Sequence, residues 1–145
     1  SNHTKMVAAG IKETYKKDPS DRKDNLGPYV RDKSFSDKWL DVWVSDQTNQ
    51  CLVTVRGSTD LVDWAVDDAL IATGTGPRDL IGPTLTKIWA KYDDDYDMEI
   101  SGHSLGASLV ATGLQSQDLD ADVVDMFNPG VVPWSNEAVS ELVIP

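Results

Sequence analysis

One serine of this chain lies in a pattern that can make it a nucleophile. Gly102-His103-Ser104-Leu105-Gly106 fits G-x-S-x-G, the sharp turn that lifts a serine out of a strand and onto the start of a helix. Gly102 and Gly106 suit that bend, because a side chain at either position would crowd the neighbouring strand or helix. The pattern predicts Ser104 as the nucleophile of an acyl transfer, with Gly102, His103 and Gly106 forming the elbow around it.

The residues on either side of the elbow have the periodicity that the motif requires. Residues 96–100 alternate apolar and acidic side chains, which indicates a strand. Residues 104–117 are rich in Leu, Ala and Val at roughly helical spacing, which indicates a helix. The alternative, a Gly/Ser loop joining two unrelated elements, gives no reason for this order of strand, turn and helix.

The rest of the chain alternates helices and strands. Residues 20–38 are polar and are expected to form one long loop, to which the sequence assigns no function. Residues 39–44 and 51–55 predict a hairpin whose second strand is the more buried. The other expected elements are a helix over 4–17, a helix opening near Asp60, a helix beginning at Pro83 with Leu85, Ile88, Trp89 and Tyr92 on one face, a strand over 122–127 and a short helix from Ser135 to about Val143. This order predicts an α/β layered domain with an N-terminal β-hairpin followed by parallel strands with flanking helices.

Composition restricts the partners of this domain. The chain of 145 residues is expected to form a single domain, 1–145, and its net charge of −11 argues against binding to nucleic acid. No run approaches 18 apolar residues, so no transmembrane segment is expected, and the first residues lack the apolar core of a signal peptide. Neither a cofactor nor a metal site is predicted, since the two histidines and Cys51 are not clustered. Cys51 lies in an apolar run and is expected to be buried and inert.

A second constellation precedes the elbow. Arg56-Gly57-Ser58 leaves the buried strand at 51–55 and is followed by Asp60, Trp64 and Asp67. Together with the elbow, this segment resembles the class 3 lipases, the fungal-lipase-like branch of the α/β-hydrolases, over about residues 39–130. In that family an R-G-S/T and a D/N-W followed by an acid come before a G-H-S-L-G elbow. The resemblance implies a truncated or minimal α/β-hydrolase fold.

The resemblance also implies roles for single residues. Ser104 would be the nucleophile, while Ser58 and Leu105 would supply the backbone N–H groups of an oxyanion hole. Asp67 would orient the Ser58 hydroxyl. Leu61, Val62 and Trp64 would occupy the lid position over the site. Two such donors aimed at a tetrahedral intermediate are commonly worth about 2.7–4 kcal/mol each. The implied substrate is an acyl ester of a lipid with a medium or long apolar chain, because nothing basic is expected at the site to hold a phosphate.

The acid and the base of a hydrolase are missing from the expected places. None of the 41 residues after Ser104 is a histidine, and His103 is expected to pack on the side of the elbow opposite to Ser104. Asp122 and Asp125 come before the end of their strand, which is the wrong end for a catalytic acid. A serine without its base is a weak nucleophile, so this chain alone is expected to be nearly inactive.

Three interpretations follow from that gap. The chain is either the N-terminal part of a longer lipase-type serine hydrolase, completed by an Asp and a His from a C-terminal segment or partner chain, or a catalytically inactive lipase-like binding or structural module. A structural α/β domain with a fortuitous elbow is the third.

A sheet of about four strands ending after Phe127 would leave an uncovered edge for added strands, and the face carrying Tyr96, Met98 and Ile100 is expected to be less well buried.

Overall fold

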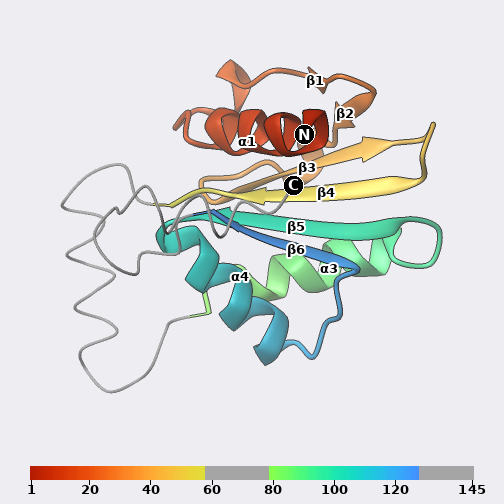
Figure 1. Ribbon diagram of the computed structural model, residues 1–145. Coiled ribbons are helices and arrows are strands. Elements are labelled where there is room, and N and C mark those ends of the chain that lie inside the picture. Colours follow the sequence, from red (N-terminus) through yellow and green to blue (C-terminus); the bar gives the residue numbers. More distant parts are fainter. Residues whose placement is uncertain (58–78, 128–145) are drawn as a thin grey trace.

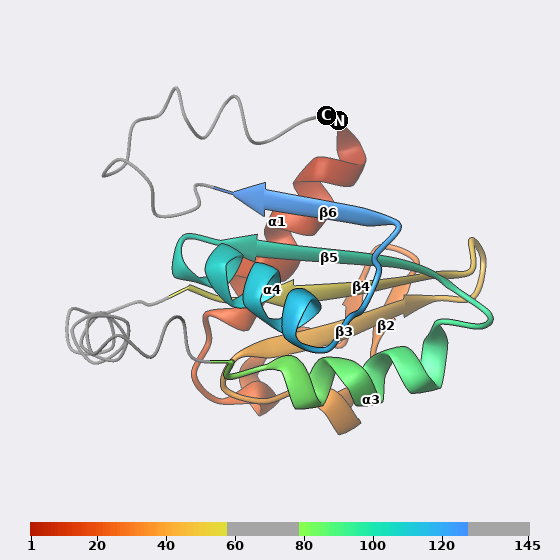
Figure 2. The same ribbon diagram turned by 90° about the horizontal axis from the view of Figure 1, so that it is seen from below.

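The computed structural model describes residues 1–57 and 79–127, and these form a mixed sheet between two layers of helices. The sheet has six strands in the order β1-β2-β3-β4-β5-β6, antiparallel from β1 to β4 and parallel from β4 to β6. One helix covers one face and two helices cover the other (Figures 1 and 2). The strands are Asn25–Leu26, Tyr29–Arg31, Leu40–Ser45, Gln50–Val55, Asp97–His103 and Val123–Phe127, and the helices are α1 (Asn2–Thr14), α3 (Gly82–Tyr92) and α4 (Leu105–Ser116).

The first helix is shifted from the expected range of 4–17. The Ser1 side chain accepts a hydrogen bond from the Thr4 N–H and caps the start, so the helix begins at Asn2. The helix ends at Thr14, whose hydroxyl lies within hydrogen-bond distance of both the Gly10 carbonyl oxygen and the Asp41 carboxylate. Helix α1 therefore ends three residues before the predicted end at residue 17.

Charged residues organise the segment 20–38, which was expected to be one long loop. It contains β1, β2 and the short 3-10 helices η1 (Pro19–Asp21) and η2 (Lys33–Phe35). The Arg22 guanidinium lies 3.0 Å from the Asp41 carboxylate, and both side chains are completely buried. The Ser36 hydroxyl donates to the same carboxylate. A buried charge pair persists only when its remaining hydrogen bonds are satisfied, and here they are. The prediction of a loop without secondary structure was wrong, because hydrophobic periodicity carries no information about contacts between charged side chains.

The expected hairpin is present as β3 and β4, with Val42 opposite Val53. The expectation that the second strand is the more buried was wrong, because Leu40, Val42 and Trp43 of β3 are as buried as β4. Helix α1 covers one face of the hairpin, where Trp43 packs with Val7 and Ile11. Helices α3 and α4 cover the other face over a larger cluster.

The second half of the described chain follows the predicted order of helix, strand, helix and strand. Helix α3 buries the predicted face of Leu85, Ile88, Trp89 and Tyr92. Met98 and Ile100 of β5 are fully buried, so the expectation of a poorly covered face at this strand was wrong. The sheet also has six strands rather than about four.

The expected open edge lies at β6, the last strand of the described sheet. Val123 is 47% exposed and Val124 42% exposed there. None of the helices in 1–57 and 79–127 is long and apolar enough to cross a membrane. The helices expected near Asp60 and Ser135 lie outside the described residues.

Candidate active site

Ser104 occupies the turn between β5 and α4, as the motif predicts. The strand ends at His103 and the helix begins at Leu105. Ser104 has a φ of 57° and a ψ of −125°, a backbone conformation that side-chain-bearing residues rarely adopt. Its N–H donates to the Phe127 carbonyl of β6 at 2.9 Å, which ties the turn to the end of the neighbouring strand. The side chain of this strained residue is only 4% exposed.

The two glycines of the motif let the strand and the helix approach closely. A Cβ atom on Gly102 would lie 2.7 Å from backbone atoms of Gly106. A Cβ on Gly106 would lie 2.6 Å from the Arg56 carbonyl oxygen at the end of β4. Both contacts are with backbone, which cannot rotate away as a side chain can. The elbow therefore has room for a hydrogen atom but not for a Cβ at these two positions.

The Arg56-Gly57 segment reaches the elbow from the end of β4. Strands β4 and β5 are parallel, and Val55 pairs with Gly102, so their carboxyl ends meet. A Cβ on Gly57 would lie 3.0 Å from the Ser104 Cβ and 2.5 Å from the His103 carbonyl oxygen. Ser58, the next residue, lies outside the described residues, as do Asp67 and the proposed lid residues Leu61, Val62 and Trp64. Leu105 is the first residue of α4, where a backbone N–H has no partner within the helix.

His103 packs against Tyr15, the residue that follows α1. Its Nδ1 lies 2.5 Å from the Tyr15 hydroxyl, and the two rings pack edge to face. The Tyr15 oxygen also accepts the Gly57 N–H at 3.1 Å. The hydroxyl proton is then available for Nδ1, an arrangement that suits a neutral imidazole protonated at Nε2. Burial lowers the pKa of His103 and favours the same neutral form.

Tyr15 falls within the helix predicted over 4–17, and no role at the elbow was predicted for it. The structure instead makes it a bridge between the elbow and the loop that begins at Gly57. Burial raises the pKa of the Tyr15 hydroxyl, against the opposing effects of the Gly57 hydrogen bond and Arg56, and keeps it protonated. Its position at the end of α1, one residue after Thr14, was visible in the sequence, whereas its partners were not.

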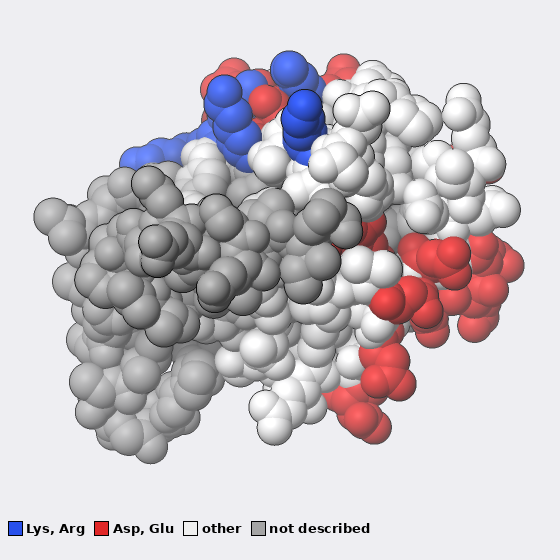
Figure 3. All heavy atoms as spheres, in the orientation of Figure 1, with Lys and Arg blue, Asp and Glu red and all other residues white. Residues whose placement is uncertain are grey.

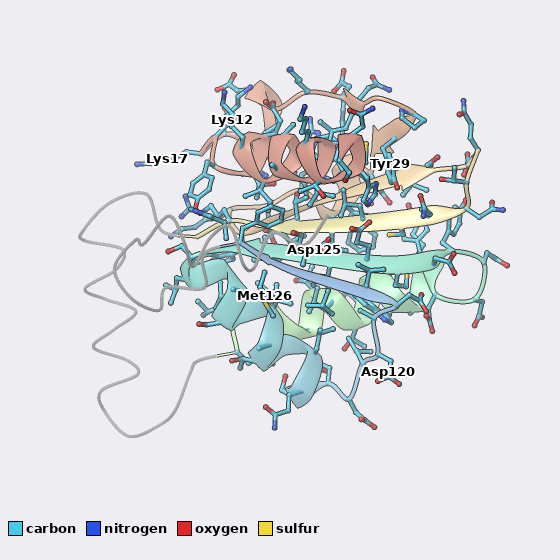
Figure 4. The ribbon with its side chains drawn as sticks, viewed as in Figure 1. Lys12, Lys17, Tyr29, Asp120, Asp125 and Met126 are labelled. Carbon is cyan, nitrogen blue, oxygen red and sulfur yellow. The ribbon has the colours of Figure 1, made fainter. Side chains whose placement is uncertain are left out.

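The carboxylates of β6 lie away from the serine, as the sequence indicates. Asp122 accepts a hydrogen bond from the Met98 N–H, near the amino end of β5. Asp125 pairs with Ser101 in the register of β5 and β6 and lies on the α1 side of the sheet, whereas Met126 lies on the α4 side (Figure 4). Asp122 and Asp125 are therefore not placed as the acid of a triad.

The buried Glu99 carboxyl and the half-buried Asp125 carboxyl lie together under the start of α1. Burial, together with the hydrogen bond and the charge of Asp125, raises the pKa of Glu99 to about 8. His3 Nε2 lies 2.8 Å from a Glu99 carboxylate oxygen. Both histidines of the chain thus bond to partners other than Ser104, His3 to Glu99 and His103 to Tyr15.

A small pocket opens between α1 and the ends of β5 and β6, beside the elbow. It has a volume of about 250 Å³ and is lined by Ala8, Ile11, Lys12, Tyr15, His103 and Phe127. Lys12, a basic residue for which no role was predicted, is among the residues that line this pocket. Cys51 is buried on the opposite side of the sheet, as expected, where burial raises the pKa of its thiol to about 12. Within residues 1–57 and 79–127, no three His, Cys, Asp or Glu side chains are placed to hold a metal ion.

Comparison with known proteins identifies the fold. No protein-family model and no curated protein matches the sequence. Among solved structures, a fungal lipase in complex with an inhibitor, described as a model for interfacial activation in lipases, aligns with a TM-score of 0.52 and 14% identity over 99% of this chain and 68% of that chain. A triacylglycerol lipase from Penicillium expansum aligns with a TM-score of 0.42 and 19% identity over 85% of this chain and 59% of that chain. The first alignment shows that the chain has a lipase-like α/β fold, shorter than that of the fungal lipase.

Proposed function

We propose that this chain is the N-terminal part of a lipase-type serine hydrolase that cleaves carboxylic esters. One observation carries the proposal, namely the strained position of Ser104 between β5 and α4 in a sheet that matches a fungal lipase. Such a turn holds the hydroxyl of a serine above the end of the sheet, where it can attack a carbonyl carbon. The proton leaves with a general base and returns to the departing alcohol, and water then releases the acid.

The oxyanion hole of this proposal combines two backbone N–H groups. Leu105 offers its N–H at the start of α4, and Ser58 would offer the second. The close approach of Gly57 to Ser104, where an added Cβ on Gly57 would lie 3.0 Å from the Ser104 Cβ, supports this role, because Ser58 is the next residue of the same segment. Asp67 would hold the Ser58 hydroxyl in place, while Leu61, Val62 and Trp64 would cover the site.

The acid and the base of the proposed enzyme come from outside these 145 residues. His103 and His3 are engaged elsewhere, and the carboxylates of β6 lie at the wrong places for a triad. The β6 edge, with Val123 and Val124 exposed, gives a C-terminal segment or partner chain a place to add a strand. That segment would bring an Asp and a His to Ser104.

The second candidate function is an inactive lipase-like binding or structural module. The same engaged histidines favour it, because a chain that keeps the elbow but has no base keeps little catalysis. The two candidates differ in one property, the reactivity of Ser104 once every natural segment of the protein is present.

Labelling with a fluorophosphonate separates the two candidates, since this reagent modifies activated serines. The longest natural product and the 145-residue chain are labelled side by side, with Ser104→Ala and with Ser108→Ala as a matched control on the same helix. We expect labelling of the longer product, loss of the label in Ser104→Ala alone, and little labelling of the 145-residue chain. A longer product that takes up no label, or a natural product that ends at residue 145 and stays unlabelled with its partners present, would establish the inactive module.

A further inference from the structure

The pocket beside the elbow has a clear position relative to Ser104. His103 precedes Ser104 in the chain, and the Phe127 carbonyl accepts the Ser104 N–H at 2.9 Å. Tyr15, a third lining residue, contacts Gly57, which itself lies against the Ser104 Cβ. A molecule in this pocket would therefore lie beside the elbow, against neighbours of Ser104 in the chain and in β6.

The pocket is mostly apolar and small. Ile11 and Phe127, both more than nine-tenths buried, contribute apolar surface, while Ala8 on an exposed position of α1 lies at the rim. Its volume of about 250 Å³ falls just below the range of roughly 300–1,000 Å³ of pockets that enclose whole drug-sized ligands. The pocket thus suits a short apolar arm, whereas the resemblance to the lipases implies a medium or long apolar chain.

Charge at the pocket selects among short ligands. Lys12 lines the pocket and pairs with no carboxylate among residues 1–57 and 79–127, whereas Lys16 pairs with Glu13. Lysine and arginine side chains gather over the end of α1 in Figure 3, where Figure 4 labels Lys12 and Lys17. Most acidic side chains seen in that view lie toward the opposite end of the molecule, although some lie among the lysines and arginines. A chain with a net charge of −11 thus presents a locally basic surface at this pocket.

From these observations we infer that the pocket binds the short apolar arm of a negatively charged ester, or the acid released from it, with the charge of the ligand beside the Lys12 ammonium. Ile11 and Phe127 remove the arm from water, and the exposed Lys12 side chain can bring its ammonium to the charge of the ligand while it stays in solvent. The ester part of this assignment rests on the proposed function, whereas binding of the anionic apolar arm does not require hydrolysis.

The two histidines of the chain provide a direct measurement of binding. His103 lines the pocket, and His3 lies in the first turn of α1, where it bonds to Glu99. In Ser104→Ala protein labelled with ¹⁵N-histidine, hexanoate, 1-hexanol and hexylammonium are titrated while both imidazole signals are followed by NMR. We expect the His103 signals to shift with affinity in the order hexanoate, hexanol, hexylammonium, and the His3 signals to stay in place.

Paired variants on α1 locate the ligand. Ala8→Trp fills the rim of the pocket and should weaken hexanoate binding at least tenfold, whereas Ala9→Trp, exposed but outside the pocket lining, should leave it unchanged. Lys12→Gln should reduce the affinity for hexanoate about two- to fivefold, the size of an exposed ion pair, without changing that for hexanol. Lys5→Gln on the same helix is the control for net charge.

The outcomes keep this inference separate from the proposed hydrolysis. The pocket assignment would be overturned if none of the three ligands shifts the His103 signals. It would also be overturned if Ala8→Trp and Ala9→Trp weaken hexanoate binding equally. Both results would count even if Ser104 takes up the fluorophosphonate. Equal affinity for hexanoate and hexylammonium would overturn the role of Lys12. Binding in the expected order by a protein that is never labelled would support the pocket and refute the enzyme.

Discussion

Replacing Gly106 by alanine tests the close packing that shapes the elbow. The new Cβ would lie 2.6 Å from the Arg56 carbonyl oxygen and 2.8 Å from the Val55 carbonyl oxygen. Overpacking costs about 1–3 kcal/mol, and the upper end applies here because β4 must shift to relieve contacts with its backbone. The higher helix propensity of alanine offsets at most about 1 kcal/mol of this cost. We therefore expect a net loss of about 2 kcal/mol.

Gly113 of the same helix is the matched control. An alanine Cβ there would lie 2.9 Å from Leu85 Cδ1 and 3.2 Å from Ile81 Cγ1, both on side chains that can adjust. The same gain in helix propensity then offsets most of the cost, so Gly113→Ala should remain within about 1 kcal/mol of the original chain. The two alanine variants should thus differ although both add one methyl group to α4.

Urea unfolding followed by tryptophan fluorescence measures this difference. With a slope of about 2 kcal/mol per molar urea, a typical value for small proteins, Gly106→Ala should lower the midpoint by about 1 M. A loss of this size leaves a chain of ordinary stability folded. If Gly106→Ala matches the original chain, or if Gly113→Ala loses as much, then backbone contact at the elbow does not explain the glycine of the motif.

Two further predictions concern the α1 side of the sheet. Tyr15→Phe should lower the free energy of unfolding by about 1–3 kcal/mol, because the Gly57 N–H and His103 Nδ1 lose their shared partner. The same variant should shift the ¹⁵N signals of the His103 ring. An unchanged denaturation midpoint would contradict the bridging role of Tyr15. The pKa of Glu99 is about 8 in the folded chain, above its ordinary value of 4.5. The protonated carboxyl therefore stabilises the folded chain fully below about pH 4.5, and this stabilisation is lost as the pH rises toward 8. Since Glu99→Gln imitates the protonated form, this variant should gain stability relative to the original chain between pH 5 and 8 in thermal unfolding, and a pH-independent difference would refute the shift.

Local patterns in the sequence determined much of the fold. The G-x-S-x-G turn, the hairpin of β3 and β4, and the buried face of α3 each depend on residues within one or two adjacent elements. Periodicity and turn chemistry act at this range, so they could be read without knowing what the elements pack against. The strained conformation of Ser104 belongs to the same group, since its two glycines already indicate a close approach.

Tertiary contacts alone decided the surroundings of the elbow. Tyr15 and His103 are 88 positions apart and meet because α1 packs across the sheet, and the same packing forms the pocket that includes Lys12. The buried pair of Arg22 and Asp41 likewise organises a segment without an apolar pattern. The sequence thus determined where a nucleophile could stand, because a turn is set by its own residues. Only the folded chain decided its neighbours, because these come from elements that are distant in sequence and brought together by packing.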